Sequence, residues 1–250
     1  MATLKNKVAL ITGGSRGLGA ATARALAADG ADIAITYVSS KEKAAAVVDE
    51  LTALGVRARA FHNDQADTGA APGLIVNVVE HFGGLDILVN NAAISVEQGV
   101  AVDSPDADID EWDRMHATNY TGVIAVTRAA TKVLRDGGRI VTVSSGVAAR
   151  TGVPGLADYA ATKAGIAAYT RGIARDLAPR GITANVIQAG LMETGMAPPD
   201  PETLAALTSS LAIQRQGRPE EQAEGIRFLV SPTASYITGA VLDTNGGYTA

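Results

Sequence analysis

Cysteine is absent from the 250 residues of this chain, which excludes disulfides, thiolate catalysis and cysteine-ligated metal. The three histidines, His62, His81 and His116, have no metal-ligand spacing, so we predict no metal site. Aromatic residues make up only 4% of the chain, whereas 47% is hydrophobic, which favours close packing through small side chains. The length fits one large α/β domain or two small ones.

An excess of basic residues and a long apolar run are also missing. The chain has 21 basic and 26 acidic residues, a net charge of −5, and no basic cluster, which argues against a nucleic-acid partner. No apolar run reaches 18 residues, and the first residues lack the hydrophobic region of a signal peptide. We therefore expect a cytoplasmic protein that does not contact membranes.

A glycine-rich segment follows the first predicted strand. Residues 8–12 form an apolar run of strand length, residues 13–19 read Gly-Gly-Ser-Arg-Gly-Leu-Gly, and a helical pattern then continues to Gly30. Glycines let the backbone approach a pyrophosphate, and a helix N-terminus attracts negative charge. We predict a dinucleotide-binding loop; a tight strand-to-helix turn without a ligand is the alternative.

The end of the second predicted strand, residues 32–37, indicates which dinucleotide binds. Folds that prefer NAD place an acidic residue there to bind the ribose 2′-hydroxyl. This chain has Ser39, Ser40 and Lys41 instead, together with Arg16 in the glycine loop, and these groups suit a 2′-phosphate. We predict NADP(H) rather than NAD(H), although the serines and Lys41 could equally cap and solvate the helix at 41–54.

Polar and small residues follow the next two predicted strands, at 57–62 and 85–89. Asp64 and Gln65 lie at the carboxyl end of the third strand, where they could bind the adenine or instead form a turn or helix cap. Residues 90–93, Asn-Asn-Ala-Ala, follow the fourth strand, and their small side chains would let a nicotinamide or ribose approach the backbone.

The remaining pattern continues the alternation of strands and helices. We predict helices at 72–82, 112–134, 204–211 and 219–229 and strands at 137–143, 182–187 and 240–243. This alternation predicts one doubly wound Rossmann fold over residues 1–250, with a parallel sheet of about seven strands and helices on both faces. The irregular segment at about 190–216 is interpreted as a mobile lid over an apolar pocket to which Trp112 and Val96 could contribute, or as a plain surface loop.

Tyr159 and Lys163 lie at the start of a long predicted helix. Positions four apart share one helix face, so the phenol and the ammonium group can point into the same cleft. A nearby positive charge would lower a phenol pKa from its ordinary value of about 10. The pair is thus a candidate proton donor and acceptor, although a Tyr-x-x-x-Lys spacing alone arises readily by chance.

Taken in order, these motifs resemble the classical short-chain dehydrogenases/reductases over essentially the whole chain, and within them the 3-oxoacyl-carrier-protein reductase and carbonyl reductase group. The resemblance rests on residues 12–19, Asp64, residues 90–92, Asn119, Ser145, Tyr159, Lys163, Asn185, Gly246 and Gly247. It implies that Tyr159 is the general acid in ketone reduction and that Lys163 lowers its pKa and binds the nicotinamide ribose. Ser145 would bind the substrate carbonyl, and Asn119 would position a water that relays protons to Lys163.

The resemblance also implies the remaining site residues and the assembly state. Val147, Leu191 and Met196 would join Ser145 in contacting substrate. Cofactor contacts besides Tyr159 and Lys163 would come from Gly13, Ser15, Arg16, Gly17, Leu18, Gly19, Ser39, Asp64, Gln65, Asn91, Ala92, Gly190, Met192 and Thr194. Family members are usually homotetramers with interfaces on the helices around Asn119 and Tyr159, and the same is expected here.

The chain departs from the family pattern in four places. Ala93 replaces a usual glycine, Ala189 replaces a usual proline after the sixth strand, and Asn245 replaces a common aspartate. Ser145 lies fourteen residues before Tyr159 rather than the usual thirteen, which a longer loop explains, with Ser144 as a weaker candidate.

The predicted activity is NADPH-dependent reduction of a ketone, carried either by a small molecule or by an acyl thioester. Two alternatives are a secondary-alcohol dehydrogenase that works in the oxidative direction and a non-catalytic protein that senses NADP(H). The second is disfavoured because Asn119, Ser145, Tyr159 and Lys163 are all present, and binding alone needs no acid.

Overall fold

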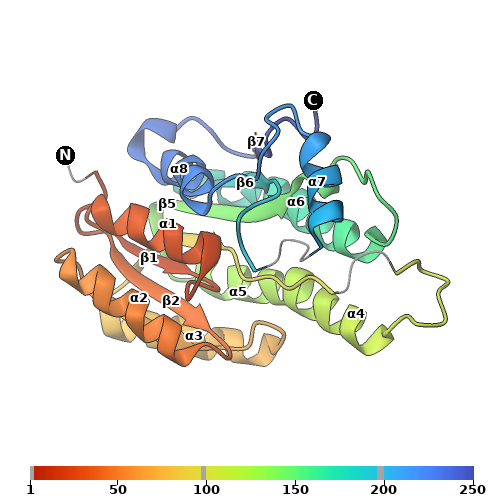
Figure 1. Cartoon of the computed structure of the whole chain (residues 1–250). Helices are drawn as coiled ribbons and strands as arrows, with labels where there is room; N and C mark the ends of the chain where they lie inside the picture. The colour runs from red at the N-terminus through yellow and green to blue at the C-terminus, as the bar shows by residue number, and fades with distance from the viewer. Residues whose placement is uncertain (1–2, 97–99, 196–199) are drawn as a thin grey trace.

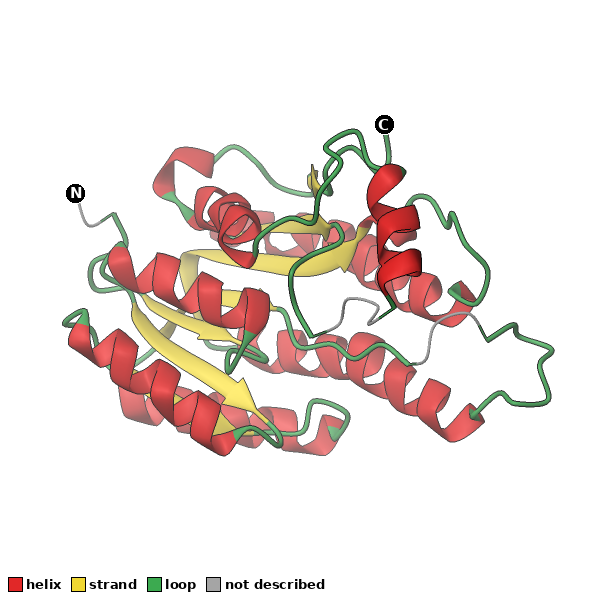
Figure 2. Ribbon diagram, in the orientation of Figure 1, coloured by secondary structure: helices red, strands yellow, loops and turns green. Residues whose placement is uncertain are grey.

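The computed structural model describes residues 3–96, 100–195 and 200–250. Its core is one parallel sheet of seven strands in the order β3-β2-β1-β4-β5-β6-β7 (Figures 1 and 2), which confirms the predicted doubly wound fold. The strands are β1 Val8–Ile11, β2 Asp32–Tyr37, β3 Ala58–His62, β4 Leu85–Asn90, β5 Leu134–Ser145, β6 Thr183–Ala189 and β7 Val241–Thr244.

Helices cover both faces of the sheet. They are α1 Gly17–Ala28, α2 Lys41–Ala53, α3 Ala71–Phe82, α4 Ile109–His116, α5 Gly122–Thr131, α6 Ala157–Leu177, α7 Pro201–Ser209 and α8 Pro219–Val230. Successive residues of a strand point to opposite faces. In β1, Ala9 and Ile11 therefore pack with α1, α2 and α8, whereas Val8 and Leu10 pack with α3, α5 and α6.

The long helix predicted at 112–134 is interrupted and ends earlier. A π-helical turn, Ala117–Thr121, separates α4 from α5 and contains Asn119. The helix ends at Thr131, because Leu134 already pairs with Leu85 in the sheet. The prediction that residue 134 is helical was therefore wrong, since pairing with a neighbouring strand overrides the local apolar pattern.

The helix in the predicted lid begins earlier than expected. Pro201 occupies its first turn, where the missing N–H of proline has no cost. The Asp200 carboxylate caps this helix by accepting a 2.7 Å hydrogen bond from the Thr203 N–H. Pro201 and the Asp200 cap therefore start α7 at residue 201 rather than at residue 204.

The direction of the strand order changes between β1 and β4. In open parallel sheets, ligands bind at the carboxyl ends of the strands next to such a point. The glycine loop follows β1 and the segment Asn91–Ala93 follows β4, so both lie at this edge. No helix within the described residues is long and apolar enough to cross a membrane.

Candidate active site

The glycine loop forms a close-packed cradle against the segment that follows β4. A Cβ atom on Gly19 would lie 2.3 Å from the Gly13 carbonyl oxygen, and one on Gly13 would lie 2.9 Å from Ala92 Cα. The Asn91 amide holds the loop by donating to the carbonyl oxygens of Thr12, at 2.9 Å, and Gly13, at 3.1 Å. Glycine is therefore required at both positions, independently of any ligand.

This cradle fits the pyrophosphate of a dinucleotide. Helix α1 begins at Gly17, and its N-cap residue Arg16 makes no side-chain capping bond, so the first-turn N–H groups are not capped by a side chain. Ser15 and the exposed Arg16 lie in the loop itself, whereas Leu18 is buried in the core. The segment after β6 also approaches the loop: a Cβ built on Gly17 would lie 3.4 Å from Cγ2 of Thr194.

The end of β2 presents hydroxyl groups to the adenosine side of this cradle. Ser39 is exposed, and Ser40 occupies the N-cap position of α2 without a side-chain capping hydrogen bond. The structure therefore contradicts the alternative interpretation, in which the Ser40 hydroxyl caps this helix. Beside them, the rings of Tyr37 and His62 meet edge to face at 5.7 Å.

Asp64 and Gln65 both make hydrogen bonds within the protein, and the contact of Asp64 with Ala66 fits the turn alternative. The Asp64 carboxylate accepts hydrogen bonds from Ala66 N–H and Arg114, each at 3.0 Å. Burial disfavours the charged form, but these two donors outweigh it and keep the pKa of Asp64 below its ordinary value. The Gln65 side chain is buried and donates to the Ala92 and Thr118 carbonyl oxygens.

The structure brings Ser145, Tyr159 and Lys163 together. Ser145 ends β5, and its hydroxyl is hydrogen-bonded to the phenol of Tyr159 on α6. The Lys163 ammonium lies one turn further along α6, 5.6 Å from the Tyr159 ring centroid, and donates to the Val143 carbonyl oxygen at 3.2 Å. The Ser144 hydroxyl instead donates to the Lys163 carbonyl oxygen at 2.8 Å in the core, so Ser145 is the serine that contacts Tyr159.

Burial dominates the protonation equilibria of this pair. It raises the pKa of Tyr159 to about 12, and the hydrogen bond from Ser145 lowers it only in part. It also lowers the pKa of Lys163 to about 8. The expectation that Lys163 would depress the tyrosine pKa is therefore wrong for the protein without cofactor, because desolvation of the phenol outweighs the neighbouring charge.

Asn119 lies in the π-helical turn and is completely buried. Its side chain makes a reciprocal pair with Ile94: the amide nitrogen donates to the Ile94 carbonyl oxygen at 2.8 Å, and the Ile94 N–H donates to the amide oxygen at 2.9 Å. Extra residues in such turns commonly mark functional sites. Asn119 thus anchors the segment after β4 beside the Tyr159 helix.

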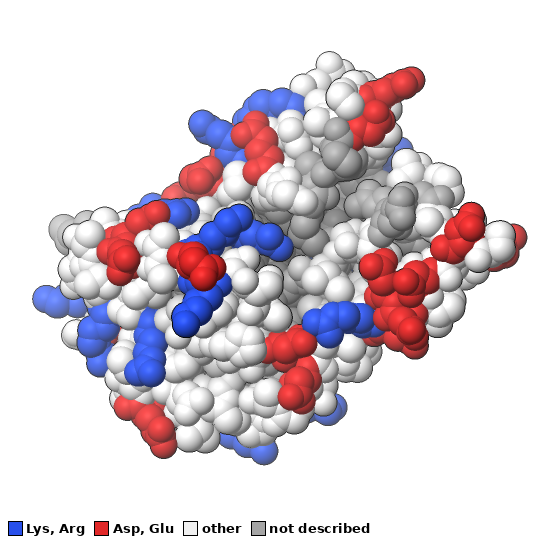
Figure 3. All heavy atoms as spheres, turned by 60° about the horizontal axis from the view of Figure 1, so that its bottom comes forward, with Lys and Arg blue, Asp and Glu red and all other residues white. Residues whose placement is uncertain are grey.

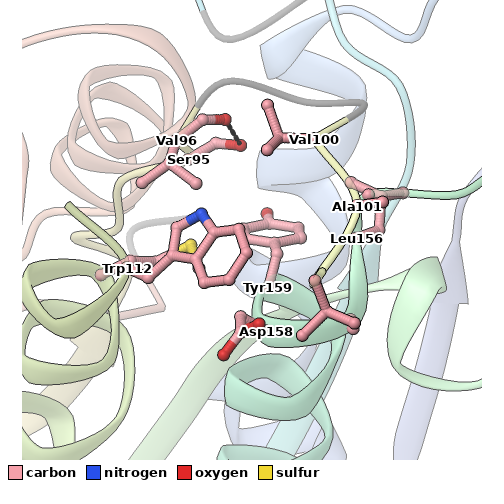
Figure 4. Close-up of a pocket in the computed structure, with 12 residues that line it drawn as sticks. Ser95, Val96, Val100, Ala101, Trp112, Leu156, Asp158 and Tyr159 are labelled. Atoms are coloured by element: carbon pink, nitrogen blue, oxygen red, sulfur yellow. Dashed lines mark hydrogen bonds between the residues drawn. The ribbon is translucent and has the colours of Figure 1, made fainter. Parts of the chain in front are cut away.

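A cavity of about 230 Å³ opens in front of Tyr159. Figure 4 shows Trp112 from α4 beside the tyrosine, with Val96 and Val100 from the segment after β4 above them. The sequence indicated Val96 and Trp112 as contributors, and the structure places both there. It did not indicate Leu156, Met115 or Asp158; the only signal for Asp158 was its position next to Tyr159.

The other predicted substrate contacts have different positions. The N–H of Val147 lies 3.4 Å from the Ser145 hydroxyl oxygen, which places it at the serine end of the site. Leu191 lines a second cavity beside the C-terminal segment, away from the Tyr159 cavity. Met196 lies outside the described residues.

The start of the predicted lid is anchored despite the missing proline. Met192 pairs with Gly217 in an isolated parallel bridge, and the Gln216 side chain donates to the Met192 carbonyl oxygen at 3.1 Å. Gly190 packs so closely that a Cβ would lie 2.6 Å from Asn245 Cα. Both ends of the segment are therefore held next to the sheet edge.

The C-terminal segment supports the long loop between Ser145 and Tyr159. The Tyr248 hydroxyl accepts a 3.0 Å hydrogen bond from Gly152 N–H, and Arg150 donates to the Tyr248 carbonyl oxygen at 2.9 Å. The Asn245 side chain accepts hydrogen bonds from the N–H groups of Gly247 and Tyr248. These contacts hold the additional residue of the loop.

A tyrosine, lysine and serine at the carboxyl edge of a doubly wound sheet, next to a pyrophosphate cradle, define an oxidoreductase of the Rossmann class. The family model described as "Enoyl-(Acyl carrier protein) reductase" matches residues 13–249. A 3-oxoacyl-[acyl-carrier-protein] reductase of Synechocystis sp. is 38% identical over 99% of this chain and 98% of its own length. The cyclic-di-GMP-binding biofilm dispersal mediator protein of Escherichia coli is 38% identical over the full length of both chains.

A crystal structure of a short-chain dehydrogenase from Burkholderia cenocepacia in complex with NADP is 46% identical, with a TM-score of 0.95 over 99% of this chain and 100% of that one. This chain belongs to the classical short-chain dehydrogenase/reductase family, close to the 3-oxoacyl-[acyl-carrier-protein] reductases. It is an oxidoreductase that acts on CH–OH and C=O groups.

Proposed function

We propose that the protein reduces a ketone to a secondary alcohol with NADPH. The observation that carries the proposal is the hydrogen-bonded Ser145–Tyr159 pair at a mainly apolar cavity, with Lys163 on the next turn of the same helix. The similarity to a B. cenocepacia enzyme that was crystallised with NADP supports this cofactor. When bound, NADPH supplies the hydride.

Three side chains would act on the substrate carbonyl and its proton. The hydroxyls of Ser145 and Tyr159 would donate hydrogen bonds to the carbonyl oxygen and stabilise the charge that develops there. The phenol would then give its proton to that oxygen, and its pKa of about 12 keeps it protonated at neutral pH. Lys163 would bind the nicotinamide ribose, and Asn119, beside this helix, would position a water that replaces the proton.

The dinucleotide would lie along the carboxyl edge of the sheet. Its pyrophosphate would contact the loop from Gly13 to Gly19, and Arg16 and Ser39 would bind the 2′-phosphate. The segment after β4, Asn91 and Ala92, would contact the nicotinamide half, opposite Gly190, Met192 and Thr194. Arg16 is exposed in the loop and Ser39 is exposed at the end of β2, which supports their role as ligands of a charged group.

Two other functions remain as alternatives. The same residues would catalyse oxidation of a secondary alcohol, with tyrosinate as the base; a phenol pKa of about 12 disfavours that direction near neutral pH unless the cofactor lowers it. A binding function is favoured by the name of the E. coli relative, a cyclic-di-GMP-binding protein. The cavity in front of Tyr159 supports catalysis over that second alternative, since a sensor needs no acid beside a substrate cavity.

The proposal includes several properties of the whole protein. Residues 1–250 would form one domain, in which the segment at 190–216 acts as a lid. The substrate would be a small carbonyl compound or an acyl thioester, and the protein would be a cytoplasmic homotetramer. The anchored positions at Met192 and Gly217 support the lid interpretation because they fix where the segment joins the sheet edge.

The test is the decrease in nicotinamide absorbance with NADPH and NADH side by side, against acetoacetyl thioesters, diketones, and cyclic and aryl ketones. Turnover with NADPH on any of them supports the proposal. Tyr159→Phe should reduce kcat by at least about 100-fold, the lower range for a general acid, while NADPH affinity stays near wild type. Retained turnover in this variant would refute the mechanism.

A further inference from the structure

The described residues that line the cavity in front of Tyr159 include one carboxylate and no cation. Its lining is mainly apolar, with Val96, Trp112 and Leu156 among the larger side chains. Asp158 is the one charged residue among the described residues that line it, and neither lysine nor arginine contributes. Figure 4 shows this aspartate at the start of α6, next to Tyr159. A substrate that reaches the tyrosine therefore passes beside a carboxylate.

The contacts of Asp158 do not reverse this charge. Its carboxylate lies 2.8 Å from Nε2 of His116 on α4. If the His116 imidazole is neutral, the Asp158 carboxylate keeps its full negative charge. If the imidazole is protonated, the net charge of the two side chains is zero. In neither case is this wall of the cavity positively charged. The nearest cation along α4, Arg114, is bound to Asp64 on the other side of the helix.

The entrance to the cavity has the same sign of charge. Residues 100–113 supply Val100, Ala101, Val102 and Trp112 to the cavity, and they contain six acidic residues and no basic one. The six are all exposed: Asp103, Asp106, Asp108, Asp110, Glu111 and Asp113. Figure 3 shows acidic side chains gathered to the right of the central hollow, at the end of the molecule that carries α4. This acidic segment therefore disfavours anions that approach the cavity along it.

We infer that the site selects uncharged or cationic carbonyl compounds and discriminates against those that carry an anionic group near the carbonyl. This inference rests on the proposed function, because it takes the cavity beside Tyr159 as the place of the reacting carbonyl. The apolar lining binds the hydrocarbon part of the substrate, whereas Asp158 and the acidic entrance raise the free energy of a bound carboxylate or phosphate.

Trp112 allows this selectivity to be measured without turnover. It is the only tryptophan of the chain, and it lines the cavity, so its fluorescence reports occupancy of this site. We would titrate the protein, with and without NADP+, with ethyl acetoacetate and with acetoacetate, which differ mainly in the negative charge. At neutral pH and low salt the ester should bind at least about tenfold more tightly, because two like charges a few ångströms apart repel strongly in a partly desolvated site. The ratio of kcat/KM should show the same preference.

Variants test whether the preference for the ester over the acid comes from the cavity wall. Asp158→Asn removes the charge at nearly constant shape and should narrow the ester-to-acid ratio. Asp136→Asn is the matched control: this aspartate is also ion-paired, with Arg180 at 2.8 Å, but it lies near the start of β5, at the opposite edge of the sheet. It should leave the ratio unchanged. His116→Gln removes the partner of Asp158 and should keep or widen the ratio.

Each outcome decides the inference separately from the proposed function. Equal binding of acetoacetate and its ester to the wild-type protein overturns the inference, even if both are reduced by NADPH. An unchanged ratio in Asp158→Asn, with wild-type Trp112 fluorescence and NADPH binding, also overturns it. A strong preference for the ester in the fluorescence titration supports the selectivity even if no ketone is reduced, in which case the reductase proposal fails instead.

Discussion

Replacing Lys163 by methionine should stabilise the cofactor-free protein at neutral pH while abolishing catalysis. The side chain is only 3% exposed, and burial lowers its pKa from 10.5 to about 8. One pKa unit corresponds to about 1.4 kcal/mol, so keeping this lysine charged in the folded state costs about 3 kcal/mol. Methionine has a similar length and no charge to desolvate. The loss of the hydrogen bond to Val143 opposes the gain by about 1 kcal/mol, which leaves a net stabilisation of about 2 kcal/mol.

The sign of the pH dependence follows from the two pKa values of Lys163. Below about pH 8 the folded and unfolded states both hold the proton, so the full penalty is present. Between about 8 and 10.5 the folded state has lost the proton and the unfolded state still binds it, so the free energy of unfolding of the wild type rises with pH. The methionine variant lacks this rise. Its advantage should therefore be largest at pH 7 and should disappear by about pH 10.5.

Urea unfolding measures this difference in stability. It is carried out on the wild type and on Lys163→Met at several pH values between 7 and 10 and at one protein concentration. Lys43→Met, on the exposed surface of α2, is the control and should change the free energy of unfolding by less than about 0.5 kcal/mol. The reasoning would be refuted if Lys163→Met were destabilised at pH 7, or if its difference from the wild type did not change with pH. Turnover should be lost at every pH.

Five further variants test the cradle, the choice of serine and the cofactor preference. Gly19→Ala should abolish cofactor binding and lower the free energy of unfolding by about 1–3 kcal/mol, because its Cβ would meet the Gly13 carbonyl oxygen. Gly73→Ala is the control, because a Cβ at this position has no atom within 4 Å, and it should be neutral or stabilising. Urea unfolding and cofactor-binding titrations measure both variants. Ser145→Ala should lower kcat strongly with little change in stability. Ser144→Ala should instead lower stability by about 1 kcal/mol and retain turnover, as its hydroxyl serves the core. Arg16→Ala should weaken NADPH more than NADH in titrations, and equal losses would exclude a 2′-phosphate role.

Much of the fold could be predicted because the elements alternate and each carries a local signal. The apolar runs at 8–12 and 85–89 became β1 and β4, and the glycines between residues 13 and 19 marked the loop that joins β1 to α1. The end of the helix at Thr131 could not be read in the same way. Leu134 is apolar and fits a helix face, but it leaves the helix to pair with Leu85, and no local pattern records the position of a distant strand.

In the site, too, the types of residue could be predicted from the sequence, whereas their surroundings could not. The spacing of Tyr159 and Lys163 placed both on one face of α6, and Ser145 was preferred to Ser144 before any geometry was known. The pKa of the tyrosine was misjudged, because its sign depends on how much protein surrounds the phenol, which the spacing does not reveal. The contacts of the Gln65 side chain could not be predicted for a related reason: the carbonyl groups that accept its hydrogen bonds come from two other segments.

Burial causes both pKa shifts in the site, and the two shifts have opposite effects on the proposed reaction. Burial keeps the Tyr159 phenol protonated, and this is the form that a ketone reductase needs in its acid. The same burial weakens the charge on Lys163, which the proposed reaction needs for binding the ribose and for relaying the proton. A bound dinucleotide whose ribose hydroxyls accept hydrogen bonds from Lys163 would favour its charged form. The residues of the site are therefore organised for an acid, and the cofactor would complete its electrostatics.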